Sequence, residues 1–566
     1  MKSAFSKSSF GLKTVLCGLG ITFSLAFQLA YADESATVAV IPAPGATDCN
    51  PYEEYTCLDD YLGTGFWQRL KNYYKLEMGQ ATPPVDPDGP LSRRDDFPPE
   101  AQTIPPMPFT EWPYGGTNPL GATIPNSVDS PFMAAIGDTD IGKWMFENHI
   151  QAYGWVDVGA NLSTNTVHGG NAPAAYDYNP NALSLSQVVL YIDRFPDMVQ
   201  KDHNDWGFRI SGIYGNDYRY TTSYGLGSNQ LLNKNLANGW DLPMLYADWY
   251  TPFVMEGLNI RVGRYISLPD IEAQLAPNNY MYSHSMTYTY DNYTNTGIMA
   301  SLAVNKNWIV QFGISDGTEA TIPHMYQTKT NPYPNNPAAG QFNPIYPNST
   351  FRVDPGANPN FTLCGRWNSD DGKDDVNFCA NDINRGTYGY NNLQWYGITV
   401  YHQIDEHWHL DAELYNEHQN NVPNANNAVV QNVYAMGGAP FSSQFMPYNA
   451  PSLASCANSS VYTCTASATG LTGYLNYSPD PMNNFSLRPE IYWDYQGQRT
   501  GTATTYRNLA VGWQHWFSPQ IEIRPEIAYY KANNAAFNGN IGNGYGNAVP
   551  NKNSQTIIAG DIIWHY

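Results

Sequence analysis

Apolar and polar residues alternate along much of the chain from about residue 150 onward. In the run FSLRPEIYWDYQ, residues 485–496, the apolar side chains fall on one face, and the polar ones, among them Arg488 and Glu490, fall on the other. Successive side chains of a strand point to opposite sides of a sheet, so this period of two predicts a β-strand with one apolar and one hydrophilic face. The pattern returns 36 residues later in IEIRPEIAYY, where Arg524 and Glu526 take the hydrophilic positions.

Other segments alternate in the same way, including 150–162, which contains Asp157, 205–214 and 407–417. About fourteen to sixteen such segments can be counted, each near the nine to eleven residues that a tilted strand needs to cross a bilayer. Short turns are expected at 305–307, 405–406, 478–484 and 518–519. Long loops are expected at 216–241, 265–294, 316–390, 418–470 and 532–553. Short turns at one end and long loops at the other are typical of an outer-membrane barrel.

The C-terminal run TIIAGDIIWHY alternates as well. Ile562, Trp564 and Tyr566 fall on one face, and the last residue is aromatic. Outer-membrane barrels close with such a strand, so we expect these three residues to form the signal read by the barrel assembly machinery. The alternative is a soluble edge strand, which would expose an unpaired apolar edge that invites aggregation.

Composition narrows the fold class. The chain has 566 residues, of which 14% are aromatic and 14% charged, with a mean hydropathy of −0.44. A soluble helical protein carries more charge, and a bundle of membrane helices needs several long apolar runs. In hydrocarbon every backbone polar group must be paired within the protein, so crossing strands must close into a barrel. We therefore predict an all-β transmembrane antiparallel barrel of about 16 strands, in the range 14–18, wide enough for a water-filled bore unless it is plugged.

The N-terminus has the pattern of a signal peptide, residues 1–32. Lys2, Lys7 and Lys13 precede an apolar run over 14–29, and Ala30-Tyr31-Ala32 resembles a cleavage site. The alternative is a retained anchor. Export predicts a location in the outer membrane of a Gram-negative bacterium, and removal of the three lysines takes the formal charge from −22 to −25. Such an acidic chain argues against nucleic acid as a partner.

Residues 33–145 differ from the rest. One amphipathic helix is expected over 66–78, and a proline-rich stretch follows it. Repeated proline removes backbone donors, so this stretch cannot join a sheet interior. We expect a periplasmic arm or plug-like extension over 33–145 and the barrel over 146–566.

Six cysteines remain after the signal peptide, in three near pairs. In an exported protein these pairs predict local disulfides that clamp loops, although free or differently paired thiols stay open. None of the spacings is a zinc signature. The predicted pairs are Cys49 with Cys57, Cys364 with Cys379, and Cys456 with Cys464.

Four runs of the chain are distinctive: RVGRYISLPDIEAQLAPNNYMYSHSMTYTYDNYTNTG from 261, YGWVDVGANLST from 153, DWGFRISGIYGNDYRYTT from 205 and GQRTGTATTY from 497. Together they resemble a known family, the putative beta-barrel porin type 2 (OmpL-like) family of Gram-negative outer-membrane proteins. The resemblance covers roughly residues 112–566. It implies a barrel with a pore, and no particular solute comes with it.

The best candidate for a pore constriction is the run SLPDIEAQLAPNN, 267–279. In a wide barrel, conductance and selectivity come from lumen charges and from loops folded inward. Folded inward, this run would set Asp270 and Glu272 against basic residues of the wall, and opposed acid and base would create a transverse field. The candidate basic residues are Arg209, Arg219, Arg261 and Arg264. The alternative is a structural loop packed against the wall.

The alternation places five further residues on the face of their strands that points into the lumen: Arg488, Glu490, Arg524, Glu526 and Asp157. A ladder of cross-strand charge pairs within the wall explains them better than a solute site, and such pairs stabilise a sheet only weakly. His407 and His409 share one face and could serve a metal, but polar residues at a barrel rim explain them better. No catalytic motif stands out, so we expect no enzyme, no cofactor and no metal.

The leading hypothesis is a porin for passive diffusion of small hydrophilic solutes, with outer-membrane lipid around it. A homotrimer is one arrangement to test, because wide general porins are often trimers. Two alternatives stay open. One is an adhesin or surface receptor that uses disulfide-clamped long loops, which conductance in planar bilayers would separate from a porin. The other is a secreted carbohydrate-binding or hydrolytic protein, which would be soluble without detergent.

Overall fold

A computed structural model of the chain describes residues 58–78, 120, 130–174, 176–223, 226–227, 229–232, 236–266, 270–292, 294–317, 321, 359–384, 393–435, 453–480, 482–539 and 549–566. The expected signal peptide, Cys49, Cys57 and most of the proline-rich stretch lie outside these ranges. Residues before Leu62 belong to a separate unit, and the barrel unit runs from Leu62 to Tyr566. None of the helices in the described ranges has the length and apolar character needed to cross a membrane.

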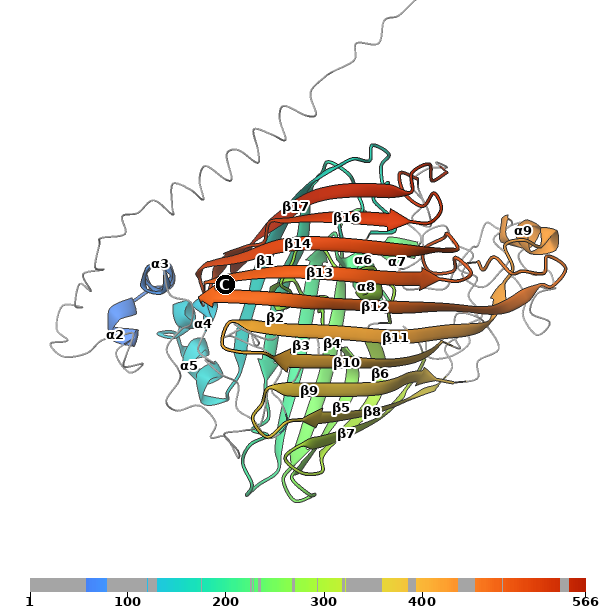
Figure 1. The fold of residues 1–566 in the computed structure, drawn as a ribbon. Helices are drawn as coiled ribbons and strands as arrows, with labels where there is room; N and C mark the ends of the chain where they lie inside the picture. Colours follow the sequence, from blue (N-terminus) through green and yellow to red (C-terminus); the bar gives the residue numbers. More distant parts are fainter. Residues whose placement is uncertain are drawn as a thin grey trace, which may run out of the picture. The chain divides into compact units, whose positions relative to one another are not determined.

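The barrel is one antiparallel sheet in which each strand pairs with its neighbours in sequence (Figure 1). Its first nine strands are β1 (Gln151–Ser163), β2 (Leu183–Arg194), β3 (Asp205–Gly215), β4 (Gly239–Thr251), β5 (Gly257–Ile266), β6 (Thr294–Ala303), β7 (Trp308–Ser315), β8 (Asn360–Asn368) and β9 (Asp374–Ile383). The others are β10 (Gln394–Gln403), β11 (Trp408–Pro423), β12 (Thr463–Asp480), β13 (Asn483–Asp494), β14 (Thr504–Ser518), β15 (Ile521–Ile523), β16 (Glu526–Ala532) and β17 (Ser554–His565).

The sheet closes where β17 pairs with β1, from Trp155 opposite His565 to Ser163 opposite Ile557. Both β15 and β16 lie between β14 and β17, so they form one strand that is interrupted at Arg524 and Pro525. Proline cannot donate to a strand ladder, which accounts for the break. The predicted all-β, 16-stranded closed barrel is therefore confirmed.

The alternating sequence pattern appears in the burial of each strand. On β13, Phe485 and Leu487 point outward with 46% and 37% of their surface exposed, whereas Arg488 and Glu490 point inward with 2% and 4% exposed. Apolar side chains thus cover the outer wall, and polar ones line the inside. A transmembrane barrel needs this arrangement, because lipid surrounds it.

Short turns lie at one end of the barrel and the long connections at the other, as expected. Two of the long loops were predicted with too many residues. The predicted loop 316–390 contains β8 and β9, and the two ends of the predicted loop 418–470 belong to β11 and β12. Apart from the ion pair between Arg366 and Asp375, the interior of this sector carries mainly asparagine, threonine and cysteine, so the alternation is weaker there.

The helix expected over 66–78 is present as α3 (Phe66–Glu77). The tyrosine hydroxyl of Tyr74 on this helix donates to the backbone carbonyl of His565 at the end of β17. Two short helices, α4 (Pro131–Ile136) and α5 (Asp140–Glu147), fall in a region expected to be an extended arm. The remaining helices are α2 (Leu58–Leu62), α6 (Tyr218–Thr221), α7 (Asn229–Leu232), η2 (Ala276–Asn278), α8 (Met286–Thr289) and α9 (Ala428–Ala435).

Two of the predicted disulfides are present. Cys456–Cys464 joins the loop after β11 to β12, close to the rim, whereas Cys364–Cys379 links directly opposed residues of β8 and β9. The second bond thus ties two strands of the wall together and does not clamp a long loop.

Candidate functional site

The connection between β5 and β6 lies inside the barrel. Residues 270–292, called the inner segment below, are buried throughout except for the partly exposed Asn278. The segment contains η2 and α8, and residues 270–279 of the predicted constriction run form its first part. Residues 267–269 of that run lie outside the described residues. A buried loop must find partners for its backbone polar groups, and those partners come from the wall.

Wall strands far from β5 and β6 supply these partners. On β2, the Gln187 side chain accepts from the Ala276 N–H at 3.1 Å and donates to the Gln274 carbonyl at 2.9 Å. On β11, Glu413 accepts from the Ile271 N–H at 3.1 Å. On β16, Glu526 accepts from the Ser283 N–H at 3.1 Å. The inner segment therefore spans the bore from its own strands to the opposite wall.

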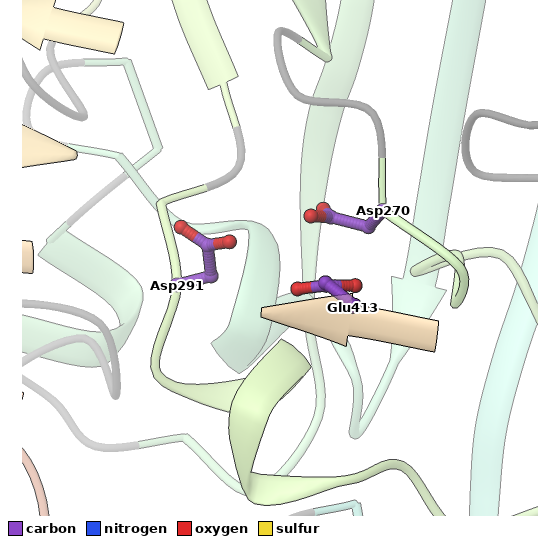
Figure 2. A group of neighbouring side chains, drawn as sticks. All are labelled: Asp270, Asp291 and Glu413. Atoms are coloured by element: carbon purple, nitrogen blue, oxygen red, sulfur yellow. The ribbon is translucent and has the colours of Figure 1, made fainter. Parts of the chain in front are cut away.

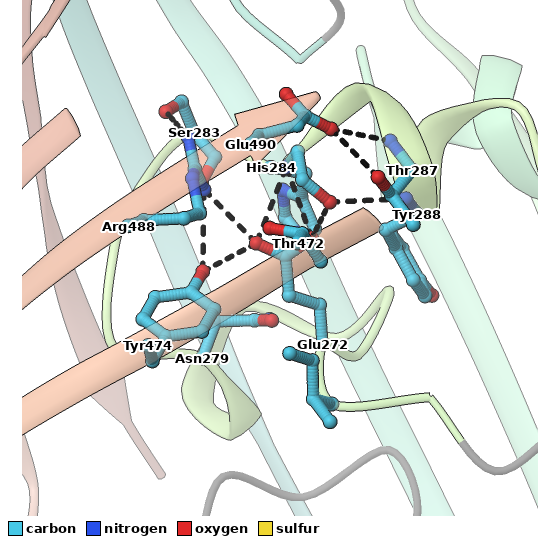
Figure 3. A network of polar contacts seen from close by, with 12 residues as sticks. Glu272, Asn279, Ser283, His284, Thr287, Tyr288, Thr472, Tyr474, Arg488 and Glu490 are labelled. Atoms are coloured by element: carbon cyan, nitrogen blue, oxygen red, sulfur yellow. Dashed lines mark hydrogen bonds and ion pairs between the residues drawn. The ribbon is translucent and has the colours of Figure 1, made fainter. Parts of the chain in front are cut away.

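The centre of this attachment is an ion pair between Glu272 and Arg488 of β13, with 2.9 Å between Oε1 and Nη1 (Figure 3). Both side chains are 2% exposed. Glu272 also accepts from the backbone and hydroxyl of Ser285 and from the Tyr474 hydroxyl. Arg488 donates to the carbonyl of Ser283 and to its hydroxyl. Burial alone would raise the pKa of Glu272, but the charge of Arg488 holds it below the usual value.

Glu490 and Arg524 attach the inner segment to the wall at two further places. Glu490 accepts from the Thr287 N–H at 2.6 Å and from its hydroxyl at 2.9 Å. Arg524 pairs with Asp561 of β17 and donates to the Asn279 carbonyl at 3.0 Å. Four of the residues assigned lumen parity, Arg488, Glu490, Arg524 and Glu526, thus contact the inner segment, and the fifth, Asp157, is buried on β1.

Three inward-facing glycines leave room for the inner segment. A Cβ on Gly159 of β1 would lie 2.3 Å from the Tyr282 ring. A Cβ on Gly470 of β12 would lie 2.6 Å from the Thr287 methyl group, and one on Gly512 of β14 would lie 2.9 Å from Met281. Real side chains do not approach so closely, so the wall is shaped for this segment.

The structure pairs the predicted basic residues with other acids than expected. Arg209 pairs with Asp193, Arg261 with Asp248 and Arg264 with Asp241. Arg219 donates to the Leu236 carbonyl and lies over the Tyr178 ring. Each of these arginines finds a nearer partner on its own or an adjacent element, so Arg488 is the one that meets Glu272.

Asp270 belongs to a group of three carboxylates with Asp291 and Glu413 (Figure 2). One carboxylate oxygen from each lies within 4.8 Å of the other two, and all three side chains are buried. Burial raises the pKa of Asp270 to about 8, and burial together with the charges of Asp270 and Glu413 raises that of Asp291. Carboxylate oxygens suit Ca²⁺ or Mg²⁺, and such an ion would take further oxygen ligands from water.

An aromatic stack packs beside the inner segment. His284 lies 3.7 Å from Tyr176, between ring centres, and Tyr176 lies 4.0 Å from Tyr220. Burial lowers the pKa of His284 to about 4, which Glu272 partly opposes. Tyr176 and Tyr220 were not singled out in the sequence, although Arg219 on the same helix α6 was.

Carboxylates dominate the charge inside the barrel. Asp and Glu far outnumber Arg among the buried residues from 150 onward that the structure describes. Those arginines are Arg209, Arg219, Arg264, Arg366, Arg488, Arg499 and Arg524. Six of the seven form ion pairs with a carboxylate. A carboxylate thus neutralises each of these six arginines, and acidic residues are in excess among the buried charged residues that the structure describes.

Residues 149–566 match the family model described as Putative beta-barrel porin-2, OmpL-like. No curated protein matches the chain in sequence. Among solved structures, the anion-selective porin from Comamonas acidovorans is 11% identical, with 74% of this chain and 99% of that chain covered and a TM-score of 0.43. The outer membrane channel DcaP of Acinetobacter baumannii is 8% identical, with 74% and 97% covered and a TM-score of 0.41. Identities of this size establish no shared solute or selectivity.

Proposed function

Because the chain belongs to the putative beta-barrel porin-2, OmpL-like family, we propose that it is a porin for passive diffusion of small hydrophilic solutes. Family membership implies an outer-membrane location in Gram-negative bacteria and a channel role in place of catalysis. In an outer-membrane barrel the short turns face the periplasm and the long loops face the outside of the cell.

The observation that carries the proposal is the inner segment, which crosses the bore and is hydrogen-bonded to opposite walls. A segment held from several sides narrows the lumen to the space that it leaves beside the wall, as a constriction loop does. An adhesin or receptor that only displays surface loops does not need such a segment, because no solute passes through its barrel.

The charge inside the barrel leads us to propose a preference for cations. Fixed carboxylates raise the local concentration of cations in a narrow, water-filled passage and exclude small anions. The excess of acid over arginine within the barrel supports this sign of selectivity.

Single-channel recording of the purified protein in planar bilayers tests the proposal. We expect discrete openings and a reversal potential in a KCl gradient that reports cation preference. The double variant Asp270→Asn/Glu272→Gln should reduce that preference, because Glu272→Gln leaves the charge of Arg488 uncompensated. The reduction should be larger at pH 9 than at pH 7, because Asp270, whose pKa is about 8, carries its negative charge mainly above that pH. The matched control Glu406→Gln/Asp480→Asn removes two carboxylates from exposed turns and should leave it unchanged. A silent but stable barrel would favour the adhesin or receptor instead.

A further inference from the structure

The outer wall of the barrel carries charge at very few places. Among the outward positions of the described strands, apart from Arg194 and Asp374 at the short-turn rim, Lys, Arg, Asp and Glu occur at Arg507 of β14 and Lys531 of β16. Both are cations, and they are direct cross-strand partners. Like charges placed directly opposite each other destabilise a sheet. An anion bound beside this pair would reduce the repulsion between the two cations.

No carboxylate among the described residues forms an ion pair with either cation. Arg507 donates to the neutral amide oxygen of Asn533 at 2.8 Å. Arg507 is exposed and Lys531 partly exposed on the outer face of the sheet. Their charges are therefore available to a molecule outside the barrel.

The loops above this pair also lack acid. Residues 418–479, 495–521 and 527–560 contain no Asp or Glu, although the whole chain carries 50 of them against 28 basic residues. The loop after β7, by contrast, includes Asp316, Glu319 and Asp354. The long connections of this sector, from β11 to β17, thus contain no acidic residue, and Asp494 at the end of β13 is buried.

The height of the pair in the wall identifies what lies beside it. Arg507 stands eleven residues above Ser518, at the short-turn end of β14. At about 3.3 Å per residue and a tilt near 40°, this is a rise of about 28 Å, close to the height of the apolar band of a barrel. Leu509, Val511 and Tyr529 form the exposed surface directly below. The two cations therefore lie at the outer boundary of the hydrocarbon layer.

We propose that Arg507 and Lys531 form a binding site for the phosphate groups of the glycolipid in the outer leaflet, the lipid A part of lipopolysaccharide. A phosphate accepts hydrogen bonds from both side chains and neutralises their repulsion. The acid-free loops above allow the acidic headgroup to approach, and the acyl chains lie on the apolar surface below. This site rests on the outer-membrane location and is independent of conduction.

The test is a binding titration of the full-length protein in neutral detergent micelles, read by native mass spectrometry. The probes are bis-phosphorylated lipid A, the same lipid with both phosphates removed, and inorganic phosphate. We expect wild type to retain bis-phosphorylated lipid A preferentially. The variant Arg507→Gln/Lys531→Gln should bind it about 30-fold more weakly, since each cation near an anionic lipid surface contributes about fivefold.

The matched control Lys306→Gln/Lys373→Gln removes two positive charges from the opposite rim and should bind like wild type. Arg507→Lys keeps the charge and should retain most of the affinity. Equal weakening in the control variant, equal binding of the dephosphorylated lipid, or displacement by inorganic phosphate at matched concentration would overturn the proposal. A change in oligomeric state without a change in lipid binding would also overturn it and assign the pair to contacts between copies.

Discussion

The substitution Arg488→Met tests how the inner segment is held. It removes the guanidinium that neutralises Glu272, while the carboxylate stays buried with 2% exposure. At 2.9 Å and an effective dielectric constant of about 20, the gross attraction is about 6 kcal/mol. Breaking one side of a buried pair costs about 3–5 kcal/mol, because the other charge remains desolvated. Ser285 and Tyr474 still donate to Glu272, so we expect a loss near the lower end, about 3 kcal/mol.

The assay is a double-mutant cycle of unfolding free energies, followed by tryptophan fluorescence in denaturant and detergent micelles. Glu272→Gln/Arg488→Met removes both charges and should cost less than Arg488→Met alone, because no buried charge is left unpaired. A coupling free energy of about 2 kcal/mol is expected between residues that are 216 positions apart in the sequence.

Single-channel recording distinguishes the ion pair that holds the inner segment, Glu272 with Arg488, from a buried ion pair within the wall. Arg488→Met should also raise the open-channel noise, since the segment loses its central attachment. The control Arg366→Met breaks a buried pair with Asp375 in the wall and should lower stability without changing the noise. Equal stability of the single and double variants, or noise that rises equally in the control, would refute the reasoning.

The sequence predicts the wall well because the relevant signal is local. Alternation over a few residues identifies a strand and assigns its two faces, so Arg488 and Glu490 are placed on the inner side without any knowledge of the fold. The two short helices were missed although their N-caps are visible: Ser130 accepts from the Met133 N–H, and Thr139 from the Gly142 N–H. Each helix is too short for a periodic apolar pattern to appear.

The contents of the bore could not be predicted in the same way. Which arginine meets Glu272 depends on barrel closure and on the path of the inner segment, and neither is encoded within a short window. Arg209, Arg261 and Arg264 are nearer to Glu272 in sequence, yet each already has an acidic partner on a neighbouring strand. Pairing between adjacent strands is satisfied first, and Arg488 is left to meet Glu272. Arg524 pairs with Asp561 on the adjacent strand β17 and also reaches the Asn279 carbonyl of the inner segment.

Three further predictions concern the inner segment. Gly159→Val should displace Tyr282, whose ring a Cβ there would meet at 2.3 Å, and raise conductance; Gly212→Val, where the nearest atom is 3.8 Å away, should not. Arg524→Met should lower stability by about 3 kcal/mol and raise conductance, since it leaves a buried carboxylate unpaired and frees the backbone carbonyls that Arg524 holds. For His284, burial holds the folded pKa at about 4, against an ordinary value of 6.5, so between these values the unfolded chain binds a proton that the folded one does not. Stability should therefore fall by about 3 kcal/mol as the pH drops from 7 to below 4. His284→Gln should remove that part of the pH dependence in denaturant titrations at pH 7 and 4.5, and an unchanged slope would show that another group carries it.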